Sequence, residues 1–207
     1  MRRASPSRHP SLETMTGYAA GALRPGFGLV VGAHVEQCPH CRGVLRGLEA
    51  ASGEALQSVE AVAMEQGALE KTLARLDSVS LPPLSDERPL LQRLPMKKRR
   101  WVAPGAWVAE VETPRAASDR VYVLHVAAGF PTARHTHDGL EFCTVLSGAF
   151  RDQTGLYGPG DFAEAEGDFD HQPAVEGDEA CVCLFATEGK LKAKGLIGRM
   201  VFAYADV

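Results

Sequence analysis

The chain has 207 residues, of which 45% are hydrophobic and 23% charged, and its formal net charge is −4 at pH 7. This composition is ordinary for a globular protein, and no apolar run approaches the roughly 20 residues that a membrane helix needs. Neither half of the chain is strongly basic, so we expect no direct contact with nucleic acid and no membrane partner.

The start of the chain carries no apolar run of the kind found in a secretory signal. Met1 to Arg3 is charged and is followed by small, polar and proline residues. We therefore expect the protein to reside in the cytoplasm. The chain also has five cysteines, and in a reducing compartment close pairs of cysteines are more often metal ligands, redox groups or core thiols than disulfides.

Composition divides the chain near residue 80. Residues 11–76 are rich in Ala, Leu, Glu and Gln, which predicts helices. The stretch 81–96 contains prolines that cannot continue a helix, and it is typical of a linker. We expect a helical domain over residues 1–80 and a second domain over residues 97–207.

Three soft metal ligands stand close together in the helical region. His34, Cys38 and Cys41 form the pattern H-x-x-x-C-x-x-C. At helical spacing they lie within roughly 60° of one another on one face, although Pro39 must stand near a helix start or a turn. Zinc prefers four ligands in a tetrahedron, with thiolates and imidazoles among them. The pattern predicts a closed structural zinc site, the alternative being a redox pair or chance.

The fourth zinc ligand could be His9, His40 or a residue from elsewhere in the chain. We favour His9, which stands at the head of a helical stretch over residues 10–23 and could be carried to the site by an antiparallel pair of helices. His40 lies between the cysteines and is expected to point away from their face. A residue from elsewhere in the chain is a further alternative. Zinc would stabilise a helical bundle too small to build much core of its own.

A last helix is expected over residues 67–76. Leu69, Leu73 and Leu76 recur at i, i+4 and i+7, which makes a narrow apolar stripe. Such a stripe either packs on its own bundle or enters a groove on a partner protein.

The second domain has the pattern of an all-β protein. Residues 121–126, 142–146 and 181–185 are short runs rich in β-branched and aromatic residues, and Gly and Pro separate such runs at close intervals. This pattern is typical of a small antiparallel barrel or jelly roll. We therefore predict a two-domain protein with an all-α bundle followed by an all-β jelly-roll barrel.

A second set of metal ligands stands in the predicted barrel. His135 and His137 share a strand face, Glu141 follows after a bend, and His171 comes later in the chain. Three imidazoles and a carboxylate suit a first-row divalent metal such as zinc, iron, manganese or nickel. The pattern does not distinguish among these metals, and the alternative is that the histidines are satisfied core groups.

Two of the remaining cysteines are separated by one residue on a predicted strand. Cys181 and Cys183 share a face of that strand, and a disulfide between them would be strained. They are either core residues or, if the face points inward, thiols near the metal that could be oxidised.

The N-terminal residues resemble the zinc-binding anti-sigma domain. The resemblance rests on His9, the run Tyr-Ala-Ala-Gly-Ala-Leu at residues 18–23, and the H-x-x-x-C-x-x-C pattern. It implies that His9 is the fourth zinc ligand. It also implies a small helical bundle that binds between the two DNA-binding regions of an extracytoplasmic-function sigma factor.

The C-terminal motif is similar to the first conserved motif of the cupins. Gly129-x5-His135-x-His137-x3-Glu141-x6-Gly148 matches that motif, and Pro159-Gly160-Asp161 with His171 resembles a looser second one. The resemblance implies a jelly-roll barrel with a metal held by His135, His137, Glu141 and His171.

An anti-sigma domain followed by a cupin resembles the ChrR family of transcriptional regulators. The resemblance implies a protein that is not an enzyme: residues 1–80 hold a sigma factor inactive, and the cupin registers singlet oxygen or a related oxidant. The trigger could lie at the cupin site or in oxidation of Cys38 or Cys41. Two alternatives are a dioxygenase-like cupin enzyme with a zinc-stabilised accessory domain, and a metal-stabilised binding module for another partner.

Overall fold

The structure is a computed structural model, and it describes residues 5–78, 88–113, 119–130, 132, 134–136, 139–167, 170–189 and 192–193. The helices are α1 (Leu12–Ala19), α2 (Pro25–Gln37), α3 (Pro39–Gln57), α4 (Ala68–Ser78) and α5 (Leu90–Arg93). In this part of the chain no helix has both the length and the apolar character needed to cross a membrane.

Two helices meet at the H-x-x-x-C-x-x-C pattern. α2 ends at Gln37, Cys38 is extended with φ −106° and ψ 105°, and α3 begins at Pro39. Proline disfavours a helical conformation in the residue before it but is well accommodated as the first residue of a helix. The predicted turn at Pro39 is therefore confirmed, whereas the expectation that all three ligands lie on one helix face is wrong.

The described residues after α5 form eleven strands. They are β1 (Arg100–Ala103), β2 (Ala106–Glu110), β3 (Arg120–Val126), β4 (His135–Thr136), β5 (Leu140–Ser147), β6 (Ala149–Asp152), β7 (Gly155–Tyr157), β8 (Phe162–Glu166), β9 (Ala174–Glu176), β10 (Cys181–Thr187) and β11 (Lys192–Ala193). The three runs predicted as strands correspond to β3, β5 and β10.

These strands pair into three antiparallel sheets. The largest has the order β1-β2-β3-β10-β5-β8, and the smaller ones have the orders β7-β6-β9 and β11-β4. The predicted succession of an all-α region and an all-β region is confirmed. Among the described strands the sheets remain separate, and their closure into one barrel is not seen.

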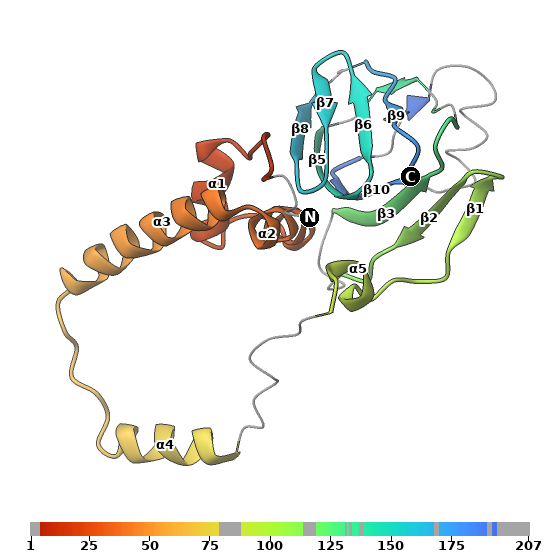
Figure 1. Cartoon of the computed structure of the whole chain (residues 1–207). Helices are drawn as coiled ribbons and strands as arrows, with labels where there is room; N and C mark the ends of the chain where they lie inside the picture. The colour runs from red at the N-terminus through yellow and green to blue at the C-terminus, as the bar shows by residue number, and fades with distance from the viewer. Residues whose placement is uncertain are drawn as a thin grey trace.

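Helix α2 packs directly on the large sheet and joins the helical and strand regions in one core (Figure 1). The Phe27 and Phe142 rings meet edge to face, with their centroids 4.8 Å apart, and both are buried. The Thr144 hydroxyl donates a hydrogen bond of 2.8 Å to the carbonyl oxygen of Val30. Burial of such large apolar side chains is the main stabilising contribution in a protein core. The two regions are therefore packed as neighbours rather than held by a linker alone.

Helix α4 lies apart from this core, as Figure 1 shows. Its apolar stripe is exposed, with Leu69, Leu73 and Leu76 at 59%, 51% and 61% exposure. Apolar side chains are also exposed at the end of α3 and in the following loop, among them Leu56 and Met64. In the described part of the chain, the stripe does not pack on its own bundle.

The domain boundaries stay predictions. Of the linker expected over residues 81–96, residues 81–87 lie outside the described residues. The short helix α5 and an isolated bridge from Met96 to Val111 occupy the rest of that segment.

Candidate metal centre

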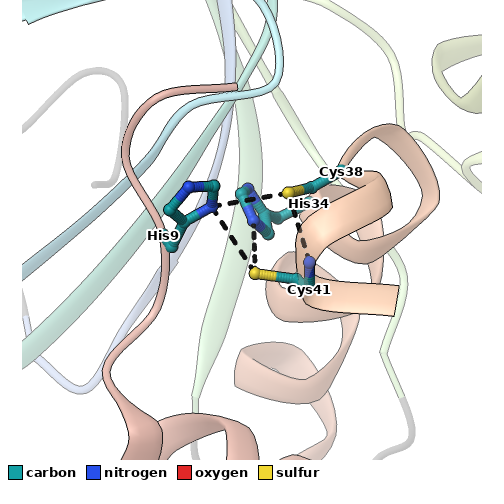
Figure 2. Close-up of side chains that lie close together, drawn as sticks. All are labelled: His9, His34, Cys38 and Cys41. Atoms are coloured by element: carbon teal, nitrogen blue, oxygen red, sulfur yellow. Dashed lines mark hydrogen bonds between the residues drawn. The ribbon is translucent and has the colours of Figure 1, made fainter. Parts of the chain in front are cut away.

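Four side chains that the sequence singles out lie close together (Figure 2). One of them, His34, contacts the turn between β7 and β8. The potential ligand atoms of His9, His34, Cys38 and Cys41 all lie within 4.8 Å of one another. His34, Cys38 and Cys41 are buried, whereas His9 is exposed. They come from the segment before α1, from α2, from the α2–α3 junction and from the first turn of α3. The structure thus brings together all four residues of the predicted N-terminal set.

Three of the distances within this set are close to those around a tetrahedral ion. His34 Nε2 lies 3.2 Å from Cys41 Sγ. His9 Nδ1 lies 3.4 Å from Cys38 Sγ and 3.6 Å from Cys41 Sγ. Zinc bonds of 2.0–2.3 Å in a tetrahedron place neighbouring ligand atoms roughly 3.3–3.8 Å apart. Two sulfurs and two imidazole nitrogens at these separations therefore suit zinc.

The start of α3 favours negative charge on the cysteines. Cys38 is the N-cap of the helix, and its Sγ accepts a hydrogen bond of 3.4 Å from the backbone N–H of Cys41. The partial positive charge of a helix N-terminus stabilises an anion such as a thiolate. The C-x-x-C spacing at the start of a helix therefore places both thiol groups where the helix N-terminus stabilises the thiolate form.

The contact of His34 with the strand region fixes which nitrogen can bind a metal. Its Nδ1 lies 2.7 Å from the carbonyl oxygen of Gly160. A carbonyl only accepts, so Nδ1 carries the proton and donates. Nε2 is then left with a lone pair directed toward Cys41. A metal-binding histidine usually makes such a bond with its second nitrogen, and the bond sets the ring orientation.

Burial favours the uncharged forms of His9, His34 and Cys41 when no cation is bound. Burial lowers the pKa of His34 to about 4, although the hydrogen bond to Gly160 acts in the opposite direction. Burial and then the neighbouring His40 lower the pKa of His9. Burial and then Cys38 raise the pKa of Cys41. A divalent metal would displace the thiol protons, so metal binding would release protons and weaken as the pH falls.

His9 reaches the site from an extended segment, not from a helix. α1 begins only at Leu12, with Ser11 as its cap. The backbone N–H of Phe162 donates a hydrogen bond of 3.1 Å to the carbonyl of Arg8, so the segment runs along β8. We expected a pair of antiparallel helices to position His9. Instead, hydrogen bonding of the preceding residue to the edge strand β8 positions it. The ring of His40 lies 4.8 Å from that of His9, but His40 is not part of the four-residue group.

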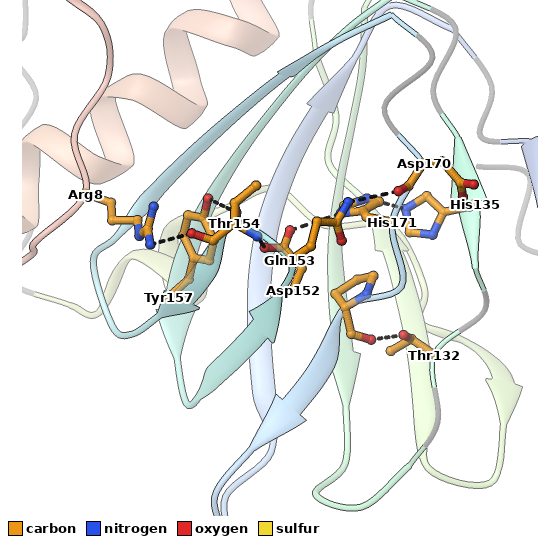
Figure 3. Close-up of polar contacts among 10 residues, drawn as sticks. Arg8, Thr132, His135, Asp152, Gln153, Thr154, Tyr157, Asp170 and His171 are labelled. Atoms are coloured by element: carbon orange, nitrogen blue, oxygen red, sulfur yellow. Dashed lines mark hydrogen bonds and ion pairs between the residues drawn. The ribbon is translucent and has the colours of Figure 1, made fainter.

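The second predicted set is described in part (Figure 3). His135 Nε2 and His171 Nε2 lie 3.0 Å apart, and the two residues also form a backbone bridge. Glu141 is buried on β5, and His137 lies outside the described residues. Within the described residues, the four-residue N-terminal group is the one cluster of at least three potential ligands close enough for an ion. The second metal site therefore stays a prediction.

The strand region contains partners that sequence reasoning missed. Asp152 Oδ2 lies 3.2 Å from His171 Nδ1, a position suited to orienting the ring. Gly160 and Asp161 were singled out only as part of the looser second cupin motif, yet they contact His34 and the residues before His9. No local sequence pattern signals these contacts, because each joins residues far apart in the chain.

The remaining cysteines are core groups in this structure. Cys143, Cys181 and Cys183 are all buried, and the sulfurs of Cys181 and Cys183 lie 3.6 Å apart without a bond between them. The pKa of Cys143 is raised, chiefly by burial, so this thiol is protonated at neutral pH.

Fold and site together define a class of protein: a helical module with a zinc-type His₂Cys₂ set, packed on a cupin-like β domain. Residues 93–191 match the family model described as "ChrR Cupin-like domain". The chain is 32% identical over 202 residues to the anti-sigma-E factor ChrR of Cereibacter sphaeroides, covering 93% of this chain and 95% of that protein.

A solved structure gives the same result. The crystal structure of Rhodobacter sphaeroides SigE in complex with the anti-sigma ChrR matches with a TM-score of 0.77 and 34% identity, over 88% of this chain and 99% of that one. The chain belongs to the ChrR family of anti-sigma factors. Since the relative is named as an anti-sigma factor, the family supports the expectation that this protein is not an enzyme.

Proposed function

We propose that this protein is a zinc-dependent anti-sigma factor that sequesters an extracytoplasmic-function sigma factor and releases it on an oxidative signal. The observation that carries the proposal is the four-residue His₂Cys₂ set, held at zinc-like distances in a chain of the ChrR family. The relative was crystallised in complex with SigE, which supports a sigma factor as the partner here. A sigma factor acts in the cytoplasm, and we place this protein there as well.

Zinc in this site would be structural. His9, His34, Cys38 and Cys41 would hold it, and all four positions of a tetrahedral shell would then be filled. The ion would tie the segment before α1 to the α2–α3 junction. Such a tie contributes directly to the folding free energy of a small helical module. It would thereby fix the direction in which α3 leaves the core.

The exposed apolar side chains of α3 and α4 supply a surface for the sigma factor. The stripe of Leu69, Leu73 and Leu76 is open, and apolar side chains at the end of α3 are open too. An amphipathic helix with an exposed stripe is suited to entering a groove on a partner. We assign sigma-factor binding to residues 1–80, the linker to residues 81–96 and signal detection to residues 97–207.

Signal detection would involve the predicted cupin metal site. The paired His135 and His171, together with His137 and Glu141, form a donor set for zinc or another first-row divalent metal. The oxidant we propose is singlet oxygen or a related species. The exposed position of His9 beside the thiols makes oxidation of Cys38 or Cys41 a second route to release.

Copurification of the full chain with an extracytoplasmic-function sigma factor from the same cell tests this proposal. We expect a stable complex, zinc in the N-terminal set and inhibition of sigma-dependent transcription. Cys38→Ser with Cys41→Ser should abolish inhibition, whereas His40→Ala, which changes a neighbour outside the set, should retain it. If the double cysteine variant inhibits as well as the unaltered protein, the zinc-dependent mechanism is wrong.

A further inference from the structure

One turn of the cupin-like domain contacts His34 and the two residues that precede His9. This turn is Gly158–Asp161, between β7 and β8. Its Gly160 carbonyl accepts a hydrogen bond of 2.7 Å from His34 Nδ1, and its Asp161 carboxylate accepts hydrogen bonds from the backbone N–H groups just before His9. The two cysteines need no such help, because the α2–α3 junction places them.

The Asp161 carboxylate is buried and accepts hydrogen bonds from three backbone N–H groups. Its Oδ1 accepts hydrogen bonds of 2.6 Å from the N–H of Ser7 and 3.0 Å from the N–H of Arg8. Its Oδ2 accepts one of 2.8 Å from the N–H of Gly158. Bonds to a charged acceptor are stronger than neutral ones. The carboxylate therefore fixes the two residues that precede His9 against the turn.

The backbone of Gly160 is shaped for a close approach. Its φ is +86°, and a Cβ there would lie 2.7 Å from Pro6 Cγ and 3.4 Å from Gln37 Cβ. An L side chain is strained at such a φ, and the space is already occupied. Glycine lets the turn lie between the N-terminal segment and the end of α2, within reach of His34.

Arg8 adds a second attachment, to the neighbouring β6–β7 turn (Figure 3). Its Nη2 donates to the Thr154 carbonyl at 2.8 Å, its Nε donates to the Leu156 carbonyl at 3.2 Å, and its guanidinium lies 4.6 Å from the centre of the Tyr157 ring. Thr154 in turn donates from its N–H and its hydroxyl to Asp152 Oδ1, at 2.8 and 2.5 Å.

The same Asp152 also contacts the histidine pair of the cupin-like domain. Its second oxygen lies 3.2 Å from His171 Nδ1, and His171 lies against His135. Figure 3 shows these side chains in a continuous row from Arg8 to His135. The row connects the residue next to one predicted metal ligand with two predicted ligands of the other site.

We propose that the β7–β8 turn of the cupin-like domain and Arg8 of the N-terminal segment form a clamp that positions His9 and His34 to hold the N-terminal metal. Gly160, Asp161 and Arg8 are positioning residues in this account, since they act through the two histidines. The inference rests on the proposed zinc occupancy of the N-terminal set. It gives the cupin-like domain a direct means to control metal retention in the anti-sigma module.

Cobalt exchange in the full chain tests the clamp. Cobalt(II) bound by Cys38 and Cys41 gives a thiolate charge-transfer absorption, which the cupin donor set of three histidines and a glutamate cannot give. The rate at which EDTA removes this absorption reports on the N-terminal site alone. Loss of a group that orients a metal ligand typically costs 10- to 100-fold in metal affinity.

We expect Arg8→Gln and Asp161→Asn each to speed cobalt loss about 10-fold or more. The control is Arg151→Gln, because Arg151 is an exposed arginine on β6 of the cupin-like domain that pairs only with surface Glu176 among the contacts described. Circular dichroism checks the fold, and Arg8→Gln decides the question if Asp161→Asn does not fold.

Loss rates for Arg8→Gln that equal those of the unaltered chain would overturn the clamp. Absence of the thiolate absorption in the unaltered chain would instead contradict the proposed zinc site itself. The two failures are thus distinguishable.

Discussion

His34 is fully buried, and burial lowers its pKa to about 4. The hydrogen bond to Gly160 opposes that shift, His9 and His40 add to it, and Asp161 opposes it. In the unfolded chain a histidine has a pKa near 6.5. Between these values the unfolded state binds more protons than the folded state does, so the free energy of unfolding rises with pH. This contribution is present above about pH 6.5 and is lost as the pH falls toward 4.

The metal-free protein should therefore lose stability as the pH falls from about 6.5 to about 4. One proton gives a slope of at most ~1.4 kcal/mol per pH unit. Denaturant unfolding at several pH values measures it. His34→Gln should flatten this slope, whereas His40→Gln should change it much less, because His40 contributes only a minor part of the shift in the His34 pKa. Equal slopes for His34→Gln and the unaltered protein would show that His34 is not the titrating group.

Comparing alanine substitutions at Gly160 and Gly177 distinguishes the cost of backbone strain from the cost of a steric clash. Their φ values are +86° and +83°, but a Cβ at Gly160 would lie 2.7 Å from Pro6, whereas none of the described atoms lies within 4 Å of one at Gly177. Gly177→Ala should cost ~1 kcal/mol of unfolding free energy from backbone strain alone. Gly160→Ala should cost at least ~1 kcal/mol more, because Pro6 must move. Denaturant titration of both variants checks this, and equal costs would contradict the close approach.

At the scale of the element, the apolar stripe of α4 is the most accessible test of partner binding. Leu73 lies on the stripe and Ala74 lies off it, although both are exposed. Leu73→Asp should weaken binding to the sigma factor by about 10-fold or more, since a buried charge without a partner is costly at an interface. Ala74→Asp should change the affinity little. Calorimetric titration gives both affinities.

The stability of Leu73→Asp is the control for that test. An exposed substitution usually changes the unfolding free energy by less than ~0.5 kcal/mol. A weakened complex with unchanged stability would place Leu73 at the interface. Equal affinities for Leu73→Asp and Ala74→Asp would show that the stripe has no part in binding.

Secondary structure and the N-terminal ligands were predictable because their signals are local. The spacing of the ligands identified His34, Cys38 and Cys41, and Pro39 predicted the turn between the two helices. The placement of His9 was not predictable in detail, because a backbone hydrogen bond from Phe162 to the residue before it supplies that placement. Contacts over such sequence separations leave no periodic pattern.

For the whole molecule, the clamp could not be predicted from the sequence, because its contacts also join residues far apart in the chain. The sequence placed Asp161 only in the looser second cupin motif, and only the folded chain brings its carboxylate to the N–H groups of Ser7 and Arg8. The shared core of Phe27 and Phe142 likewise joins two regions that composition separates. The sequence predicted two modules, and the structure packs the first against the second through α2.

The row of contacts from His171 to Arg8 predicts communication across the molecule. Burial opposes ionisation of Asp152, but hydrogen bonds from Thr154 and His171 outweigh it and lower the pKa of this carboxyl. Asp152→Asn should loosen the β6–β7 turn and speed amide hydrogen exchange at Ser7 and Arg8 several-fold. Asp178→Asn, in an exposed bend, is the matched control. Unchanged exchange at both amides would show that the row carries no coupling.

The central claim is that metal in the N-terminal set enables this protein to hold a sigma factor. The most direct measurement is the affinity of the full chain for an extracytoplasmic-function sigma factor of the same cell, with zinc bound and after its removal. We predict tight binding with about one zinc in the His₂Cys₂ set, and a loss of at least about 100-fold, ~2.7 kcal/mol, without it. An affinity that is the same with and without zinc would contradict the account.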